Sequence, residues 1–192
     1  MKLNLISIVL LSIIISSCGK KMKDAEHQHE NLSADTVPPD TVKKSIPKDV
    51  HHQLGGAHLI IKYHAPAVRG RTIWGGLVPY NDVWVTGAHK ATSFEIDKDF
   101  IVEEKTIAAG KYALFSIPKE GKWTFIINKN WDQHLADEYD QKDDLVRIDV
   151  TPEQLPNVQE RLKYSIVSID DSKGAIEISW EKVKLSLPIQ IK

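Results

Sequence analysis

Cysteine is almost absent from this 192-residue sequence, which contains a single one, Cys18. One cysteine excludes an internal disulfide framework, a Cys-x-x-Cys redox pair and a cysteine zinc cluster. Any folded part of the chain must therefore be stable on its hydrophobic core alone.

Net charge is nearly absent as well, because 25 lysines and arginines face 26 aspartates and glutamates. No basic patch and no stripe of arginines among aromatics stands out, so nucleic acid is not an expected partner. Nucleotide loops are missing too: Gly75-Gly76 is not followed by Lys-Ser/Thr, and no G-x-G-x-x-G can be drawn. These absences leave a small-molecule, metal or protein partner as the classes to consider.

The N-terminus carries an apolar run from Leu3 to Ile15. A membrane-spanning helix needs about 20 apolar residues, so this run is too short to span and instead suits the core of a signal peptide. Ser16-Ser17 stand directly before Cys18, which resembles the bacterial lipobox. We predict a lipoprotein signal peptide over residues 1–17 and acyl chains on Cys18 that hold the protein in a lipid bilayer. The expected location is extracytoplasmic, in the bacterial cell envelope, with the outer membrane as the expected membrane and its periplasmic and outward faces both open; an ordinary signal peptide is the alternative.

Residues 18–47 have no apolar periodicity and are rich in lysine, aspartate, serine, threonine and proline, which is typical of a disordered tether. His27 and His29 form a His-x-His pair that can chelate copper or zinc, although a plain polar tether explains them equally simply. Asp-Thr-Val occurs twice and resembles a bacterial O-glycosylation sequon, which makes Thr36 and Thr41 candidate glycosylation sites.

Residues 48–192 have the periodicity of β-strands and enough length for one domain. Leu59, Ile61 and Tyr63 alternate with polar residues, and residues 92–96 and 147–150 alternate in the same way. Residues 112–117 and 123–127 flank a proline- and glycine-bounded turn, and residues 162–166 and 175–180 flank the turn 170–174. The predicted fold is all-β, an antiparallel sandwich or jelly-roll-like barrel of about 8–10 short strands.

Two local features refine this prediction. Trp180 and Val183 are an odd number of residues apart, so both can face the core only if a bulge or bend lies near Glu181. Residues 131–144 are the one segment that could hold a short helix. Their acidic residues fit a solvated loop better than a catalytic carboxylate pair, and their spacing does not match an EF-hand.

The densest stretch of the sequence is residues 70–92, GRTIWGGLVPYNDVWVTGAHKAT. Its patterns GRxIWGGLVPY and VWxTGA, followed by AGKYALFSIP at 109–118, resemble the bacterial domain family DUF2911 over residues 47–189. The resemblance implies a β-rich module found in exported proteins and carries no settled activity. The glycines are expected to allow positive φ or close backbone approach at a corner. Five residues of the stretch and its flank are candidates for a ligand rim, namely Arg69, Arg71, Trp74, Tyr80 and Trp84, although packing is the simpler role for the two tryptophans.

Three histidines stand at or beside positions where this sequence departs from the family pattern: His52, His64 and His89. The family pattern has Tyr-Ser-Arg-Pro at 63–66 and Arg-Thr-Gly-Ala-Asn-Glu at 85–90. If the family's polar residues form a site, this chain has rebuilt it with imidazoles, and converging neutral histidines bind Zn(II) or Cu(II). The alternative is exposed histidines beside Lys62 and Lys90, whose charge disfavours a cation.

Three functions of different class remain open. The first is a membrane-anchored, non-enzymatic β-sandwich that binds a ligand, with copper or zinc as its candidate cofactor. The second is a hydrolase that uses Arg69, Arg71 and a histidine at the glycine-rich corner, although the sequence lacks a G-x-S-x-G elbow and offers no catalytic residue by pattern. The third is a structural scaffold of the envelope, which should expose an apolar patch without convergent polar groups.

Overall fold

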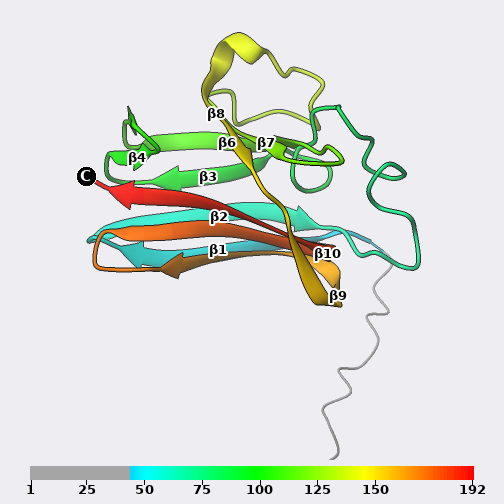
Figure 1. Ribbon diagram of the computed structural model, residues 1–192. Coiled ribbons are helices and arrows are strands. Elements are labelled where there is room, and N and C mark those ends of the chain that lie inside the picture. Colours follow the sequence, from blue (N-terminus) through cyan, green and yellow to red (C-terminus); the bar gives the residue numbers. More distant parts are fainter. Residues whose placement is uncertain (1–43) are drawn as a thin grey trace, which may run out of the picture. The chain divides into compact units, whose positions relative to one another are not determined.

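The computed structural model describes residues 44–192, which form an antiparallel β-sandwich (Figure 1). The predicted signal peptide, Cys18 and most of the tether, with His27, His29, Thr36 and Thr41, lie outside the described residues. No helix in the described part has the length and apolar character to cross a bilayer. The described strands are β1 (Ile46–Leu54), β2 (Ala57–Ala65), β3 (Thr92–Ile96), β4 (Phe100–Val102), β5 (Lys105–Ile107), β6 (Gly110–Ile117), β7 (Trp123–Asn128), β8 (Asp144–Val150), β9 (Glu153–Ser168) and β10 (Lys173–Ile191).

Two sheets make up the sandwich. The larger has six strands in the order β1-β2-β3-β6-β7-β8, and the smaller has four in the order β5-β4-β10-β9. The sheets do not close on each other, so of the two predicted architectures the sandwich is correct. Strand β1 begins at Ile46, two residues before the predicted domain start.

The strands form where apolar residues alternate. In β2 the odd-numbered residues, Leu59 to Ala65, are buried and the even-numbered ones are exposed or half-buried, because successive side chains point to opposite faces of a pleated strand. The β6–β7 hairpin pairs Ile117 with Thr124 across the predicted proline- and glycine-containing turn. The short strands β4 and β5 lacked a readable pattern and were not predicted.

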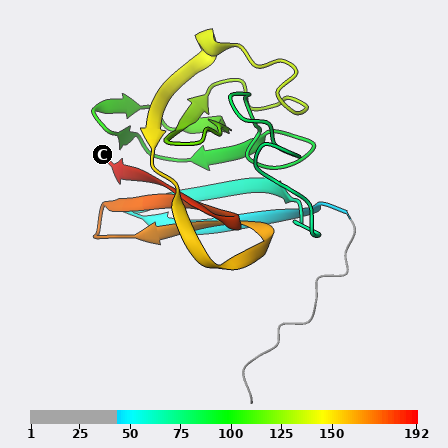
Figure 2. The same ribbon diagram turned by 45° about the vertical axis from the view of Figure 1, so that its right-hand side comes forward.

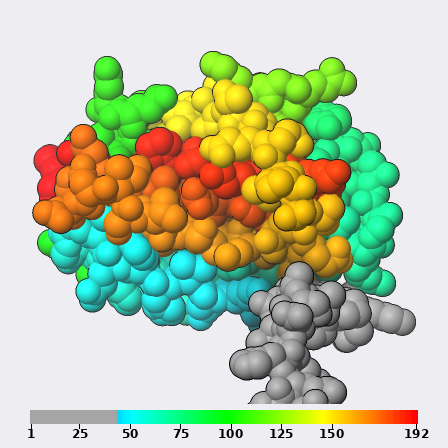
Figure 3. Space-filling view, turned by 60° about the horizontal axis from the view of Figure 1, so that its bottom comes forward, coloured from blue at the N-terminus to red at the C-terminus, as the bar shows by residue number. Residues whose placement is uncertain are grey.

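The longest element is the hairpin of β9 and β10, which crosses the molecule diagonally (Figure 2). Its register shifts on both sides of Glu181, whose φ is 56°. This irregularity keeps Trp180 and Val183 both buried, as the odd spacing of these residues predicted. Residues 183–187 are therefore the continuation of β10 beyond the bulge. In the space-filling view, β9 covers the middle of one face, and residues of β1 and β2 lie below it (Figure 3).

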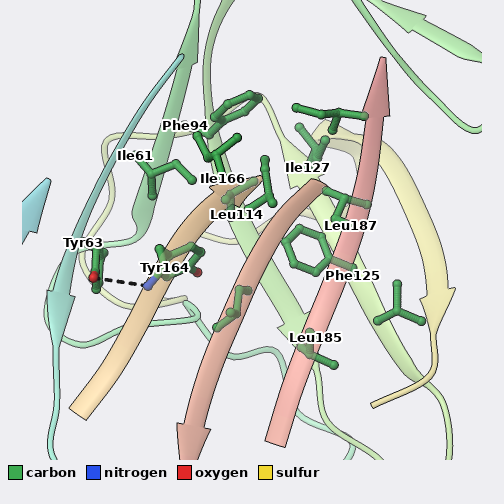
Figure 4. Close-up of a cluster of buried hydrophobic side chains, with 14 of the residues drawn as sticks. Ile61, Tyr63, Phe94, Leu114, Phe125, Ile127, Tyr164, Ile166, Leu185 and Leu187 are labelled. Carbon is green, nitrogen blue, oxygen red and sulfur yellow. Dashed lines mark hydrogen bonds between the residues drawn. The ribbon is translucent and has the colours of Figure 1, made fainter. Parts of the chain in front are cut away.

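The core lies between the two sheets. Ile61, Phe94 and Leu114 of the larger sheet face Ile166 and Leu187 of the β9–β10 hairpin, and all five are buried (Figure 4). A polar contact crosses the same space, because the Tyr164 backbone N–H donates to the Tyr63 hydroxyl over 3.2 Å. Large aliphatic and aromatic side chains on inward positions of both sheets thus supply the stability that disulfides cannot.

A second, smaller core covers the outer face of β6 and β7. Val85 and Ala91 from the segment between β2 and β3 pack there with Phe115 and Ile126, and Ala136 and Tyr139 from the segment after β7 are added at the edge. Residues 66–91 therefore fold around one end of the sandwich, with Ile73 and Val78 in the main core and Val85 in the outer one.

The predicted short helix at 131–144 is present only as a three-residue 3₁₀ turn, Gln141–Asp143. Around Gln133 and Leu135 the backbone pairs instead with the loop between β2 and β3. Leu135 N–H donates to the His89 carbonyl, and Ala91 N–H donates to the Gln133 carbonyl. These long-range bonds replace the i→i−4 bonds that an α-helix would need.

Candidate functional site

Residues 66–91, together with Trp180 of β10 and Leu135, form a pocket of about 390 Å³. Small-molecule sites commonly have volumes of roughly 300–1,000 Å³ and a mostly apolar lining with a few polar groups. The lining has this character. The apolar residues that matter most are Pro66, Leu77, Pro79, Trp84, Leu135 and Trp180, and the charged or polar ones are Ser45, Arg69, Arg71, Asp82 and His89.

The inner wall of the pocket belongs to a cluster of tryptophans. Trp84 and Trp180 stack with ring centroids 5.6 Å apart and an interplanar angle of 21°. Trp74 meets both edge to face and also meets Trp123 at 4.6 Å. Such aromatic pairs contribute about 0.5–1.5 kcal/mol each beyond their buried area, so this wall is rigid.

Hydrogen bonds to tryptophan N–H groups fix only part of this cluster. Trp84 Nε1 donates to the Gly87 carbonyl over 3.1 Å. The buried Nε1 atoms of Trp74 and Trp180 have no conventional partner among the described residues. Their edge-to-face neighbours give a physical account, because an indole N–H can point at the π-face of an adjacent ring.

Arg71 is held in the pocket wall by backbone carbonyls. Its Nε donates to the Val68 carbonyl at 3.1 Å and its Nη2 to the Ala67 carbonyl at 2.5 Å. Nearby, the Arg69 backbone N–H donates to the Glu160 carboxylate at 2.8 Å, which joins the start of the loop to β9. The loop therefore positions two arginines at one side of the pocket.

Four residues in and beside the pocket wall have positive φ although they are not glycine: Arg69 (53°), Thr86 (48°), His89 (65°) and Leu135 (50°). Left-handed backbone costs a non-glycine residue on the order of 1–3 kcal/mol and persists only where the surroundings enforce it. Thr86 is the most unusual, because a β-branched side chain rarely adopts this conformation. Strain of this kind gathers at binding and catalytic sites, so its presence here supports a functional pocket.

Buried hydrogen bonds hold Thr86 in place. Its Oγ lies 2.7 Å from the Leu114 carbonyl, and its own carbonyl accepts from Tyr164 Oη at 2.9 Å and from Thr92 Oγ at 3.1 Å. Burial raises the pKa of Tyr164, so this hydroxyl remains protonated and donates its hydrogen bond at neutral pH. The turn at 84–87 is thereby fixed to both sheets.

The sequence of this domain matches a known protein family. The family model described as "Protein of unknown function (DUF2911)" matches residues 45–189. The chain belongs to the DUF2911 family. No curated protein and no solved structure matches it.

Of the five residues predicted for a ligand rim of this DUF2911 domain, three line the pocket: Arg69, Arg71 and Trp84. Trp74 lies behind the wall, in contact with Trp84 and Trp180. Tyr80 packs beside Gly75, where an added Cβ would be 2.8 Å from its ring.

Asp82, Leu135 and Trp180 are among the lining residues that sequence reasoning missed. Trp180 was assigned to the core, where it also belongs, and only the meeting of β10 with the loop makes it part of the pocket. Asp82 lay inside the singled-out stretch but had no partner in sequence to suggest a role. Leu135 reaches the pocket because its segment pairs with His89 rather than forming a helix.

The structure brings together two of the three histidines at the positions where the chain departs from the DUF2911 pattern. The rings of His64 and His89 meet edge to face with centroids 5.3 Å apart. His89 lines the pocket, whereas His64 lines a neighbouring hollow of about 280 Å³ with Lys62, Lys90 and Asp132.

His52 does not join them, and the predicted convergence of three histidines is not observed. His52 is paired with Leu59 and His64 with Pro47, which places them five residue pairs apart, about 17 Å. The pleat also points them to opposite faces, since His52 shares the inward face with Leu59. Its Nε2 is 2.9 Å from Ser168 Oγ. Within residues 44–192 no three or more histidine, cysteine, aspartate or glutamate side chains are grouped to hold a metal ion.

The hydrolase hypothesis also needs groups that converge. Ser45, Asp82 and His89 all line the pocket, yet in the described part of the chain no hydrogen bond joins any two of them. An activated nucleophile ordinarily lies within hydrogen-bond reach of its base.

The histidine pair makes one prediction about pH. Burial lowers the pKa of His64 below its usual value of 6.5, and the nearby His89 and Lys90 lower it further. A histidine with a lower pKa in the folded state contributes stability that is fully present above about pH 6.5 and is lost as the pH falls through the folded pKa. We therefore expect the stability difference between wild type and His64→Gln to shrink as the pH falls from 7.5 to 5.

Urea unfolding at several pH values measures this difference. The slope of this stability difference against pH should be smaller than about 1.4 kcal/mol per pH unit, the limit for one proton, because His64 is half-exposed. A difference that stays constant across this range would contradict the prediction.

Proposed function

We propose that the DUF2911 domain is a non-enzymatic module that binds a small ligand in the pocket between residues 66–91 and Trp180. The pocket itself carries the proposal, because it combines an apolar aromatic wall, two arginines in the lining and strained backbone in a space of small-molecule size. The scaffold hypothesis required an apolar patch without convergent polar groups. Here the exposed leucines, Leu77 and Leu135, lie beside Arg69 and Arg71 in the same lining.

We further propose that this module is displayed at the surface of a bacterial membrane by acyl chains on Cys18. The support is sequence alone: a short apolar N-terminal run, Ser16-Ser17 before the cysteine, and a polar segment of about thirty residues before β1. A module of this kind would hold or present its ligand in the envelope. Copper and zinc have no part in this proposal, since His64 and His89 meet as a pair and no larger ligand set lies within residues 44–192.

N-phenyl-1-naphthylamine tests the binding function, because this neutral aromatic probe becomes fluorescent in apolar surroundings. Ala88→Phe adds a ring to the half-exposed pocket lining without disturbing the buried core. We expect it to weaken probe binding on the order of ten-fold or more, which corresponds to about 1.4 kcal/mol. Ala109→Phe is the matched control, since Ala109 is exposed and lies outside the pocket lining.

All variants carry the same residues 1–43, so any probe bound by that part of the chain is common to all and drops out of the comparison. Equal probe affinity in wild type, Ala88→Phe and Ala109→Phe would show that the pocket is not a binding site. Circular dichroism establishes that each variant is folded before its affinity is compared.

A further inference from the structure

We propose that the ligand of this pocket carries an anionic group, which Arg71 binds, on an apolar planar body that lies against the tryptophan wall. The inference rests on the proposed binding function and adds the chemical class of the ligand. Carboxylate, sulfonate and phosphate share the chemistry that would be recognised.

Arg71 is the first reason. Two of the five N–H donors of its guanidinium are used on backbone carbonyls, which fixes the plane of the group. Those carbonyls are neutral, and no carboxylate within the described residues forms an ion pair with Arg71. A positioned guanidinium with unused donors and an uncompensated charge is suited to bidentate binding of an anion.

The charge around Arg71 is the second reason. Arg69 lines the same pocket as Arg71. Asp82 is the one acidic side chain in the lining, and it makes no ion pair with a described residue. Cationic groups therefore outnumber anionic ones, and a negative ligand group would be attracted to the pocket.

The apolar part of the lining is the reason for proposing a planar apolar body in the ligand. Trp84 and Trp180 stack nearly parallel, and Pro66, Pro79 and Leu77 complete an apolar surface around them. Leu77 remains 47% exposed, so its side chain has apolar surface left for a ligand to cover. Aromatic rings prefer to bind such surfaces by offset or edge-to-face contact.

A matched pair of probes separates the two halves. N-phenyl-1-naphthylamine and 8-anilinonaphthalene-1-sulfonate share an aromatic body, and only the second carries an anionic sulfonate. Arg71→Gln keeps a hydrogen-bond donor for the backbone carbonyls but removes the charge. We expect Arg71→Gln to weaken the sulfonate probe about ten-fold, in line with a charge-assisted hydrogen bond, and to change the neutral probe less than two-fold.

Two further variants act as controls. Lys173→Gln removes a positive charge seven residues along β10 from Trp180, roughly 23 Å away, and should change neither affinity. Asp82→Asn removes the acidic lining residue and should tighten the sulfonate probe, so the inference stays testable even if Arg71→Gln fails to fold. Raising the salt concentration should weaken sulfonate binding in wild type and have a smaller effect in Arg71→Gln.

The outcomes distinguish the inference from the function on which it rests. If Arg71→Gln weakens both probes equally, or neither, and Asp82→Asn leaves the sulfonate probe unchanged, the pocket is a site for neutral ligands and the anionic inference is wrong. If neither probe binds the pocket of the wild type, the proposed function fails with it. Tighter sulfonate binding by Arg71→Gln would likewise overturn the inference.

Discussion

Replacing Trp180 with alanine is expected to lower the free energy of unfolding by about 3–5 kcal/mol, the range for large aromatic residues in cores. Trp180 is 1% exposed, which makes it one of the most completely buried large side chains of the described domain. Its ring contacts Trp74 edge to face and stacks on Trp84, and it packs where β10 bends at Glu181. Removing the ring leaves a cavity that the rigid neighbouring indoles cannot fill.

The same substitution should also remove the probe-binding function, because Trp180 forms the inner wall of the pocket. Urea unfolding followed by circular dichroism measures the stability loss without relying on the altered tryptophan fluorescence. Trp131→Ala is the matched control: Trp131 is 38% exposed and meets Lys111 at the surface, so its loss should cost less than about 1 kcal/mol. If Trp180→Ala were no more damaging than Trp131→Ala, the tryptophan cluster would not be part of the stabilising core.

Much of the fold was predictable because a β-strand shows its alternation of apolar and polar residues within a short stretch of sequence. Alternation marks the buried face of β2, and the turn residues at 118–121 and 170–174 separate strands that do pair as hairpins. The bulge at Glu181 was predictable for the same reason, since a pleat of period two cannot bury both Trp180 and Val183 without one. These inferences need only neighbouring residues.

Features that depend on distant residues were not predictable. The segment 131–144 has a composition compatible with a helix, yet its backbone pairs with residues 89–91, and only the folded chain reveals that partner. His52 was grouped with His64 because both depart from the family pattern. In the paired strands β1 and β2 the two histidines lie five residue pairs apart. That separation could not be read from the sequence without knowing how the strands pair.

The pocket shows the same division. Its loop half was visible in the sequence as a dense run of glycine, tryptophan and proline, but its other half comes from β10. The stretch 70–92 is therefore both an architectural corner and one wall of a candidate binding site. Glycine is needed for the first role, and Arg71 and Trp84 for the second.

Gly76 matters both for the corner and for the pocket wall. Gly76→Ala is expected to destabilise the domain by about 1–3 kcal/mol. A Cβ at this position would lie 2.5 Å from the Thr72 carbonyl oxygen, a contact that a rigid backbone cannot relieve. That carbonyl accepts a 3.0 Å hydrogen bond from Leu77 N–H, and the adjacent Val78 N–H donates to the Ile73 carbonyl at 2.9 Å. The added methyl group must open this turn.

Opening the turn would move Leu77 and Val78, which line the pocket, so probe binding should weaken together with stability, on the order of ten-fold. Gly121→Ala is the matched control, because a Cβ there meets nothing within 4 Å, and it should change stability by less than about 0.5 kcal/mol. Gly70→Ala separates strain from collision: its φ of 67° is unfavourable for alanine, but the site is open, so we expect a loss of about 1 kcal/mol with binding retained. A loss for Gly76→Ala no larger than for Gly121→Ala would mean that close packing against Thr72 does not require glycine at position 76.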